Sequence, residues 1–166
     1  MKLTTKSITK IAVIAAIYVA MTLMPGLNAI AYGPIQFRVS EVMTVLPIFT
    51  PLAIPGLTIG CLVSNIISPI GAPDMVFGTL ASFLAALCSY LLRNKPKALA
   101  VLPAVVSNGL IVGWMITFFY EQPSTGFMTV MLYNMLTVAA GEAAVCYILG
   151  LPLAIYINKH RNIVKL

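Results

Sequence analysis

The chain has 166 residues, of which 60% are hydrophobic and only 8% are charged. A soluble globular domain carries charge on about a quarter of its residues, so this composition excludes one and indicates an integral membrane protein. Each span of the hydrocarbon core takes about 20 residues, which leaves room for about six or seven spans at most. The net charge of +6 does not indicate nucleic acid, because the basic residues lie in short clusters beside apolar runs.

The apolar runs predict an all-α integral membrane protein with six transmembrane helices in a single domain, residues 1–166. The first run stops at Pro25 and Gly26, and the turn-forming stretches "SPIGAP" and "EQPSTG" separate later runs. The predicted helices cover about residues 9–24, 36–49, 52–68, 74–92, 98–120 and 127–157. The triplet from Ala29 to Ala31 also resembles a signal-peptide cleavage site, but the charge balance favours a retained first helix.

The basic residues predict the orientation of these helices. With six spans, nine of the ten lysines and arginines fall on one side of the membrane. They are Lys2, Lys6, Lys10, Arg93, Lys95, Lys97, Lys159, Arg161 and Lys165. Because positive loops face the cytoplasm, we expect both termini there, and Arg38, Asp74 and Glu121 on the outer side.

Signatures of an enzyme are absent from the sequence. It contains no G-x-x-x-x-G-K-[ST] phosphate loop and no HExxH or GxSxG motif. His160 lies alone in the basic tail, and Cys61, Cys88 and Cys146 lie in apolar runs without the spacing of a metal or redox site. We therefore expect no catalytic residue and no metal site, and we interpret the cysteines as small packing residues.

A few polar residues lie where the membrane makes them expensive. A charge at the bilayer centre costs about 2.5–3.5 kcal/mol, so such residues normally face a cavity or a partner. Glu142 lies near the middle of the last apolar run, which makes it the strongest candidate for a pocket carboxylate. Asn65 and Asn108 are weaker candidates, because hydrogen bonds between helices also explain buried amides. Trp114 is a candidate surface for stacking a planar ligand, although tryptophan also populates the membrane interface.

Arg38 and Glu41 stand three residues apart just before the second apolar run. At this spacing they share a helix face and are expected to pair, which lowers the cost of placing either near the outer surface. The pair either anchors the helix end or holds a carboxylate ready for a ligand. Asp74 opens the fourth run, where an acidic residue suits the positive end of the helix dipole.

In the first helix, Ala12, Ala16 and Ala20 recur every four residues. Small residues at this spacing let another helix approach closely in lipid. The pattern is weak by itself, because alanine is common in membrane spans.

Five stretches of the sequence, in order along nearly the whole chain, resemble one known family. They are "FRVSEVMTVLP", "AIPGLTIGCLVSNI", "DMVFGTLASFLAA", "SNGLIVG" and "GEAAVCYILGLPL". They are similar to the QueT family, the queuosine-precursor substrate-binding (S) subunits of energy-coupling factor (ECF) transporters. The resemblance implies a six-helix bundle in the bacterial plasma membrane that captures a 7-deazaguanine, such as 7-aminomethyl-7-deazaguanine (preQ1), from outside the cell.

The resemblance also implies partners. A transmembrane coupling subunit and two ABC-type ATPases would supply the energy, so ATP would be hydrolysed by the partners and this chain would need no cofactor. In such families an A-x-x-x-A pattern on the first helix contacts the coupling subunit, and Ala12, Ala16 and Ala20 match that pattern by position. Other readings remain open: an S subunit for another vitamin or purine-like micronutrient, or an autonomous ion-coupled transporter using Glu142.

The chemistry of a 7-deazaguanine suggests which residues would bind it. Its adjacent ring N–H and amino groups can donate to one carboxylate, and its cationic aminomethyl group favours a second. Glu41, Asp74 and Glu142 are the candidate carboxylates, Asn65 and Asn108 would complete the contacts to the base edge, and Arg38 would support Glu41. The sequence does not determine which carboxylate contacts which group of the ligand. We also expect residues 25–37, rich in Gly and Pro, to act as a lid.

Overall fold

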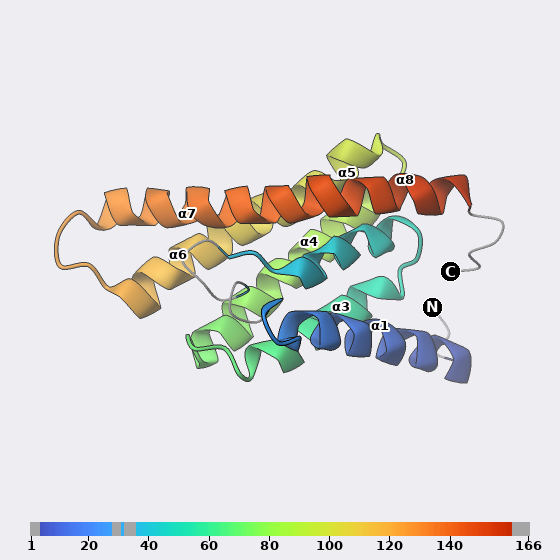
Figure 1. The fold of residues 1–166 in the computed structure, drawn as a ribbon, viewed down its shortest axis with the longest axis horizontal. Helices are drawn as coiled ribbons and strands as arrows, with labels where there is room; N and C mark the ends of the chain where they lie inside the picture. Colours follow the sequence, from blue (N-terminus) through green and yellow to red (C-terminus); the bar gives the residue numbers. More distant parts are fainter. Residues whose placement is uncertain (1–3, 28–30, 32–35, 161–166) are drawn as a thin grey trace.

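The computed structural model describes residues 4–27, 31 and 36–160, and all the regular structure among them is helical. Its α-helices are α1 (Thr5–Leu23), α3 (Ala53–Asn65), α4 (Thr79–Leu91), α5 (Lys97–Ser107), α6 (Gly113–Met115), α7 (Phe127–Ala143) and α8 (Leu151–Lys159). Between them lie the 3₁₀-helix η1 (Val39–Ile48) and the π-helical segments η2 (Asp74–Gly78), η3 (Asn108–Val112), η4 (Ile116–Glu121) and η5 (Ala144–Gly150). Several consecutive α-helices and π-helical segments follow each other without a break and form longer continuous helices (Figure 1).

Within the described ranges, four of these continuous helices are long and apolar enough to cross a membrane. They cover Thr5–Leu23, Asp74–Leu91, Lys97–Glu121 and Phe127–Lys159. The other two apolar helices are shorter: η1 has 10 residues and α3 has 13. At about 2.0 Å per residue in a 3₁₀-helix and 1.5 Å in an α-helix, each is about 20 Å long, against a hydrocarbon core of about 30 Å. The all-helical membrane fold therefore agrees with the prediction, whereas six full spans remain a prediction.

The ends of the helices are arranged as the charge pattern predicts. Figure 1 shows that α1 begins and α8 ends at the same end of the molecule, and that the connection between η4 and α7 lies at the opposite end. The chain reverses at that connection through Gln122, at φ +43°, and Gly126, at φ +67°. Glycine is favoured in this left-handed region because it lacks a Cβ. The cytoplasmic side of the molecule stays a prediction from the positive-inside rule.

Small residues form much of the core. One cluster of buried apolar residues, where α4, α5 and α8 meet, contains Ala85, Ala100, Ala104 and Ala154. Lipid tails are as apolar as these side chains, so van der Waals packing rather than a hydrophobic driving force holds such helices together. Small side chains serve this purpose because they let the helix backbones approach closely.

Two glycine pairs with G-x-x-x-G spacing bring helices into closest contact. On α3, a Cβ added to Gly60 would lie 2.9 Å from Tyr18 Cβ and 3.1 Å from the Ala15 carbonyl of α1. The pair is completed by Gly56, which faces Ile14. The α3 face that packs against α1 therefore has no room for larger residues.

The second glycine pair, Gly109 and Gly113, faces α7. A Cβ at Gly109 would lie 2.9 Å from Ala139 Cβ, and one at Gly113 would lie 2.5 Å from Met135 Cα. Cβ atoms in real proteins do not approach other heavy atoms this closely, and a helix backbone cannot give way as a flexible side chain can. The packing of η3 and α6 against α7 therefore depends on these glycines.

The π-helical segments lie beside several of the polar residues. Asp74 is the first residue of η2, Asn108 is the first residue of η3, and η5 begins two residues after Glu142. A π-helical turn accommodates an extra residue and rotates the following side chains relative to a regular helix, and such turns are frequent at functional sites. Hydrophobic periodicity in the sequence does not reveal them.

Replacement of Gly113 by alanine tests the close contact with α7. Because its new methyl group would collide with the Met135 backbone, we expect Gly113→Ala to destabilise the protein by about 1–3 kcal/mol. The measurement is thermal unfolding of the purified protein in detergent. The control is Val106→Leu on the same continuous helix, where the parent side chain is 47% exposed. Equal unfolding midpoints for both variants would contradict the packing described here.

Candidate functional site

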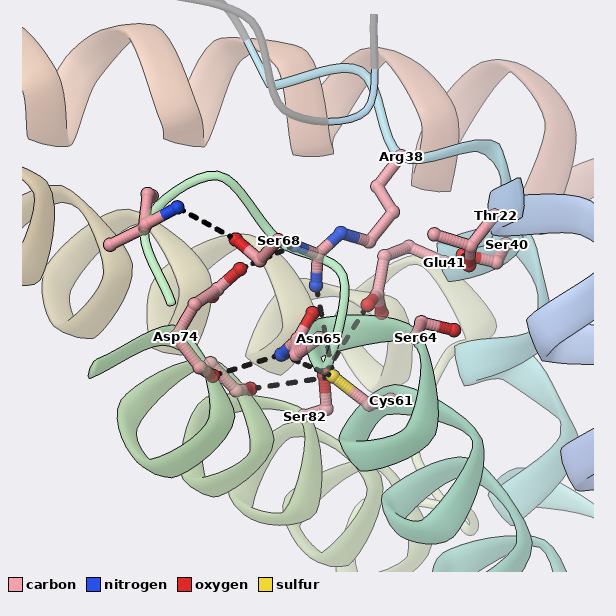
Figure 2. A network of polar contacts seen from close by, with 12 residues as sticks. Thr22, Arg38, Ser40, Glu41, Cys61, Ser64, Asn65, Ser68, Asp74 and Ser82 are labelled. Atoms are coloured by element: carbon pink, nitrogen blue, oxygen red, sulfur yellow. Dashed lines mark hydrogen bonds and ion pairs between the residues drawn. The ribbon is translucent and has the colours of Figure 1, made fainter. Parts of the chain in front are cut away.

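Buried polar side chains from distant parts of the chain meet inside the bundle. Each is at most 5% exposed: Arg38, Glu41, Asn65, Asp74, Ser82, Asn108 and Glu142. They come from η1 and the residue before it, and from α3, η2, α4, η3 and α7. Figure 2 shows the side chains of Arg38, Glu41, Asn65, Asp74 and Ser82 converging around Cys61. Apart from Trp114, the structure brings the residues predicted to bind a ligand to the interior.

Arg38 makes its ion pair with Asp74. Its Nη2 lies 3.5 Å from Asp74 Oδ2, and its Nη1 lies 3.7 Å from Cys61 Sγ. The sequence spacing predicts pairing of Arg38 with Glu41, and the two groups do interact electrostatically, but the ion pair that Arg38 makes at 3.5 Å is with Asp74, far along the chain. The physical reason is local: Arg38 is extended, with φ −90° and ψ 93°, and precedes the helix that contains Glu41.

Glu41 is held through one of its two carboxylate oxygens. Tyr18 donates its hydroxyl hydrogen to Oε1, and Ser82 Oγ lies 3.3 Å from the same oxygen. The other oxygen, Oε2, is buried and has no hydrogen-bond partner among the described residues. A second link, from Thr22 Oγ1 to Ser40 Oγ at 2.7 Å, also joins α1 to η1. Helix α1 therefore fixes the position of Glu41.

Asn65 and Asp74 form a second polar contact. Asn65 Nδ2 donates to the Asp74 carbonyl at 2.9 Å, whereas Asn65 Oδ1 and Asp74 Oδ1 have no hydrogen-bond partner in the described ranges. Gly78 makes this contact possible, because a Cβ there would lie 2.8 Å from Asn65 Nδ2. Two further acceptor atoms are thus held inside the bundle.

Glu142 lies in α7, close enough to Glu41 for the two carboxyl groups to interact electrostatically. Cys146 lies one turn further on, and its thiol donates to Glu142 Oε1 at 3.3 Å. Asn108 lies beside the Glu142 carboxyl, and its Nδ2 makes no close hydrogen bond with any described residue. Glu142 and Asn108 therefore place an acceptor and a donor side by side.

Trp114 lies in an aromatic cluster near the end of the continuous helix Lys97–Glu121. Its ring stacks on Phe118, with centroids 5.3 Å apart and an interplanar angle of 15°. Phe77 and Phe119 contact it in edge arrangements at 5.4 and 6.0 Å. One face of the indole is therefore used by Phe118, and a role in stacking on a ligand stays a prediction.

Sequence reasoning missed several members of the polar network. The sequence led us to interpret Cys61 as a packing residue. Its Sγ lies 3.2 Å from Ser82 Oγ and 3.4 Å from Asn65 Nδ2. Cys146 contacts Glu142, and Tyr18 contacts Glu41. Tyr18 offered one signal, because its place in the middle of an apolar helix is unusual for a residue that favours the membrane interface.

The lid prediction for residues 25–37 is only partly covered by the structure. Residues 28–30 and 32–35 lie outside the described residues. Ala31 and Gln36 are buried, with exposed fractions of 1% and 6%. The lid therefore stays a prediction.

The cluster has the chemistry of a binding site for a ligand rich in hydrogen-bond donors. Buried polar atoms normally find partners, and each one left without a partner costs about 1–3 kcal/mol. Four such atoms here are acceptors, namely Glu41 Oε2, Asn65 Oδ1 and both carboxylate oxygens of Asp74, and Asn108 Nδ2 is a donor. No group of three or more potential metal ligands occurs among the residues that the structure describes. A ligand that supplies N–H groups would satisfy these acceptors.

Comparison with known proteins identifies the family. The family model described as "QueT transporter" matches residues 8–159. The queuosine precursor transporter QueT of Lactococcus lactis subsp. cremoris (strain MG1363) is 42% identical over 93 residues, which are 56% of this chain and 54% of that protein. The alignment thus spans about half the length of this curated relative, and no solved structure matches. The match over residues 8–159 confirms the resemblance seen in the sequence: the chain belongs to the QueT transporter family and is a multi-pass membrane protein.

Proposed function

We propose that this chain is the substrate-binding subunit of an ECF-type importer and captures a 7-deazaguanine precursor of queuosine, such as preQ1, from outside the cell. The observation that carries the proposal is the buried cluster, which holds three carboxylates and one arginine, in a chain of the QueT transporter family. PreQ1 is rich in donors: a ring N–H, an exocyclic amine and a cationic aminomethyl group. Carboxylates bind such groups through charge-assisted hydrogen bonds, which are about twice as strong as neutral ones.

The proposed source of energy lies in partner subunits. The chain has no phosphate-loop motif, so an ATP-driven importer that contains it would need separate ATPases and a membrane subunit that transmits their movement. The surface of α1 offers a place for that subunit, because Ala12, Ala16 and Ala20 are exposed, whereas Tyr18 on the opposite face is buried. Helix α1 would thus contact the partner with one face and support Glu41 with the other.

Two alternatives would behave differently from the proposed subunit. An S subunit for another vitamin or purine-like micronutrient would bind that compound in preference to preQ1. An autonomous ion-coupled transporter would accumulate substrate in vesicles that contain this chain alone, driven by an ion gradient. Uptake by the reconstituted chain without ATPases would contradict the proposal of an ECF subunit.

Ligand binding by the purified chain tests the proposed substrate. We expect preQ1 to bind in detergent without any partner, and Glu142→Gln to weaken binding because the carboxylate loses its charge. A charge-assisted hydrogen bond contributes about 1.5–3 kcal/mol, which corresponds to roughly tenfold to hundredfold in affinity. Isothermal titration calorimetry measures the change, and Glu121→Gln is the control because Glu121 is exposed and its hydrogen bond comes from Asn134, outside the polar cluster. If preQ1 does not bind, or both variants lose affinity equally, the proposed substrate site is wrong.

Assembly with the coupling subunit is tested on α1. We expect Ala16→Leu to prevent co-purification with the coupling subunit and ATPases, because the larger side chain blocks close helix contact. Binding of preQ1 by the isolated subunit should remain. The control is Ala140→Leu, which enlarges an exposed alanine on α7. Normal assembly of Ala16→Leu, or equal loss in the control, would remove α1 from the interface.

A further inference from the structure

The three carboxylates of the polar cluster differ in the charged and hydrogen-bonding partners that the protein gives them, and this difference bears on how a ligand would be oriented. The inference rests on the proposed function, because it concerns how a 7-deazaguanine would bind. Each carboxylate oxygen accepts up to two hydrogen bonds. The contacts made within the protein therefore show which groups each carboxylate can still accept.

Asp74 is the carboxylate that already faces a cation. Its Oδ2 lies 3.5 Å from Arg38 Nη2, although neither of its carboxylate oxygens accepts a hydrogen bond from a described residue. Removing one partner from a buried ion pair leaves an uncompensated charge, so this pair is expected to persist when a ligand binds. Asp74 therefore does not attract a cationic group as strongly as an unpaired carboxylate would.

Glu41 has one open oxygen. The hydroxyl groups of Tyr18 and Ser82 both approach Oε1, while Oε2 is buried without a hydrogen-bond partner among the described residues. Arg38 also interacts electrostatically with Glu41. Glu41 is therefore suited to one cationic donor at Oε2, and poorly suited to a pair of parallel donors that needs both oxygens.

Glu142 is more open and has a donor beside it. The hydrogen bond that the structure gives its carboxylate comes from Cys146, and a thiol is a weak donor. The Asn108 amide lies next to the carboxylate, and its Nδ2 is buried without a close hydrogen bond to any described residue. An amide donor beside a carboxylate complements a base edge on which a carbonyl acceptor stands next to N–H donors.

We propose that Glu142 and Asn108 bind the pyrimidine edge of the 7-deazaguanine, while Glu41 Oε2 binds its aminomethyl ammonium group. In the ligand, the aminomethyl group is attached on the carbonyl side of the ring system, so the two carboxylates must be neighbours. Glu41 and Glu142 meet this condition, because Cys146 Sγ lies 3.3 Å from Glu142 Oε1 and 3.8 Å from the backbone carbonyl of Glu41. The assignment makes Glu142 responsible for recognising the base and Glu41 for preferring the cationic substituent.

Tyr18 becomes a positioning residue under this assignment. It would not touch the ligand, because its hydroxyl is used on the Oε1 side of Glu41. Its side chain is fully buried between α1 and η1, so the donor cannot turn to water. Loss of the hydroxyl should weaken the preference for the aminomethyl group without removing recognition of the base.

The test compares preQ1 with 7-deazaguanine, which lacks the aminomethyl group, by calorimetry on the purified full chain. We expect Glu41→Gln to weaken binding of preQ1 about tenfold more than binding of 7-deazaguanine, and Glu142→Gln to weaken both ligands by similar factors. Tyr18→Phe should also reduce the preference for preQ1 over 7-deazaguanine, but only by a few-fold. Tyr133→Phe is the control, because Tyr133 is 61% exposed.

A third ligand tests the base edge. 7-Deazahypoxanthine lacks the exocyclic amine, so the parent should bind it roughly tenfold more weakly than 7-deazaguanine, and Glu142→Gln should largely abolish this difference. Equal losses of both 7-substituted and unsubstituted ligands in Glu41→Gln, or an unchanged amine preference in Glu142→Gln, would overturn the assignment. If Glu41→Gln does not fold, Tyr18→Phe decides the same point. Failure of the parent to bind any deazaguanine would instead overturn the proposed function.

Discussion

The ion pair between Arg38 and Asp74 is the constraint on which the arrangement of the polar cluster depends. Both side chains are almost completely buried in a bundle that is mostly apolar. A charge in such surroundings is costly unless it is paired and hydrogen-bonded. Pairing therefore ties the segment before η1 to the start of η2, beside Cys61 and Asn65 (Figure 2).

The close packing of small residues makes this arrangement rigid. The glycine pair on α3 lets this helix pack directly against α1, and the glycine pair on η3 and α6 lets these segments pack directly against α7. Helix α1 then lies near enough for Tyr18 to reach Glu41, and η3 lies near enough to α7 for Asn108 to lie beside Glu142. Preorganised donors and acceptors lower the entropic cost of binding, because the protein need not order them when the ligand arrives.

The same packing relates the site to the outer surface of α1. One face of this helix carries exposed alanines and the other carries Tyr18 and Thr22, which contact η1. A partner on the alanine face and a ligand at Glu41 would thus be separated by a single helix. If both assignments hold, this arrangement would give a short physical path by which occupancy of the site affects assembly.

The sequence by itself determined the class of the protein, the approximate extents of its apolar helices and its family, because composition, hydropathy and turn residues act locally. It also indicated Glu41, Asn65, Asp74, Asn108 and Glu142, since polar residues in apolar runs are costly and therefore conspicuous. Only the tertiary structure decided how these residues are paired. Arg38 is three residues from Glu41, yet its ion pair is with Asp74, and Tyr18 reaches Glu41 across 23 positions. Such contacts depend on helix approach and on π-helical turns, which local sequence patterns do not encode.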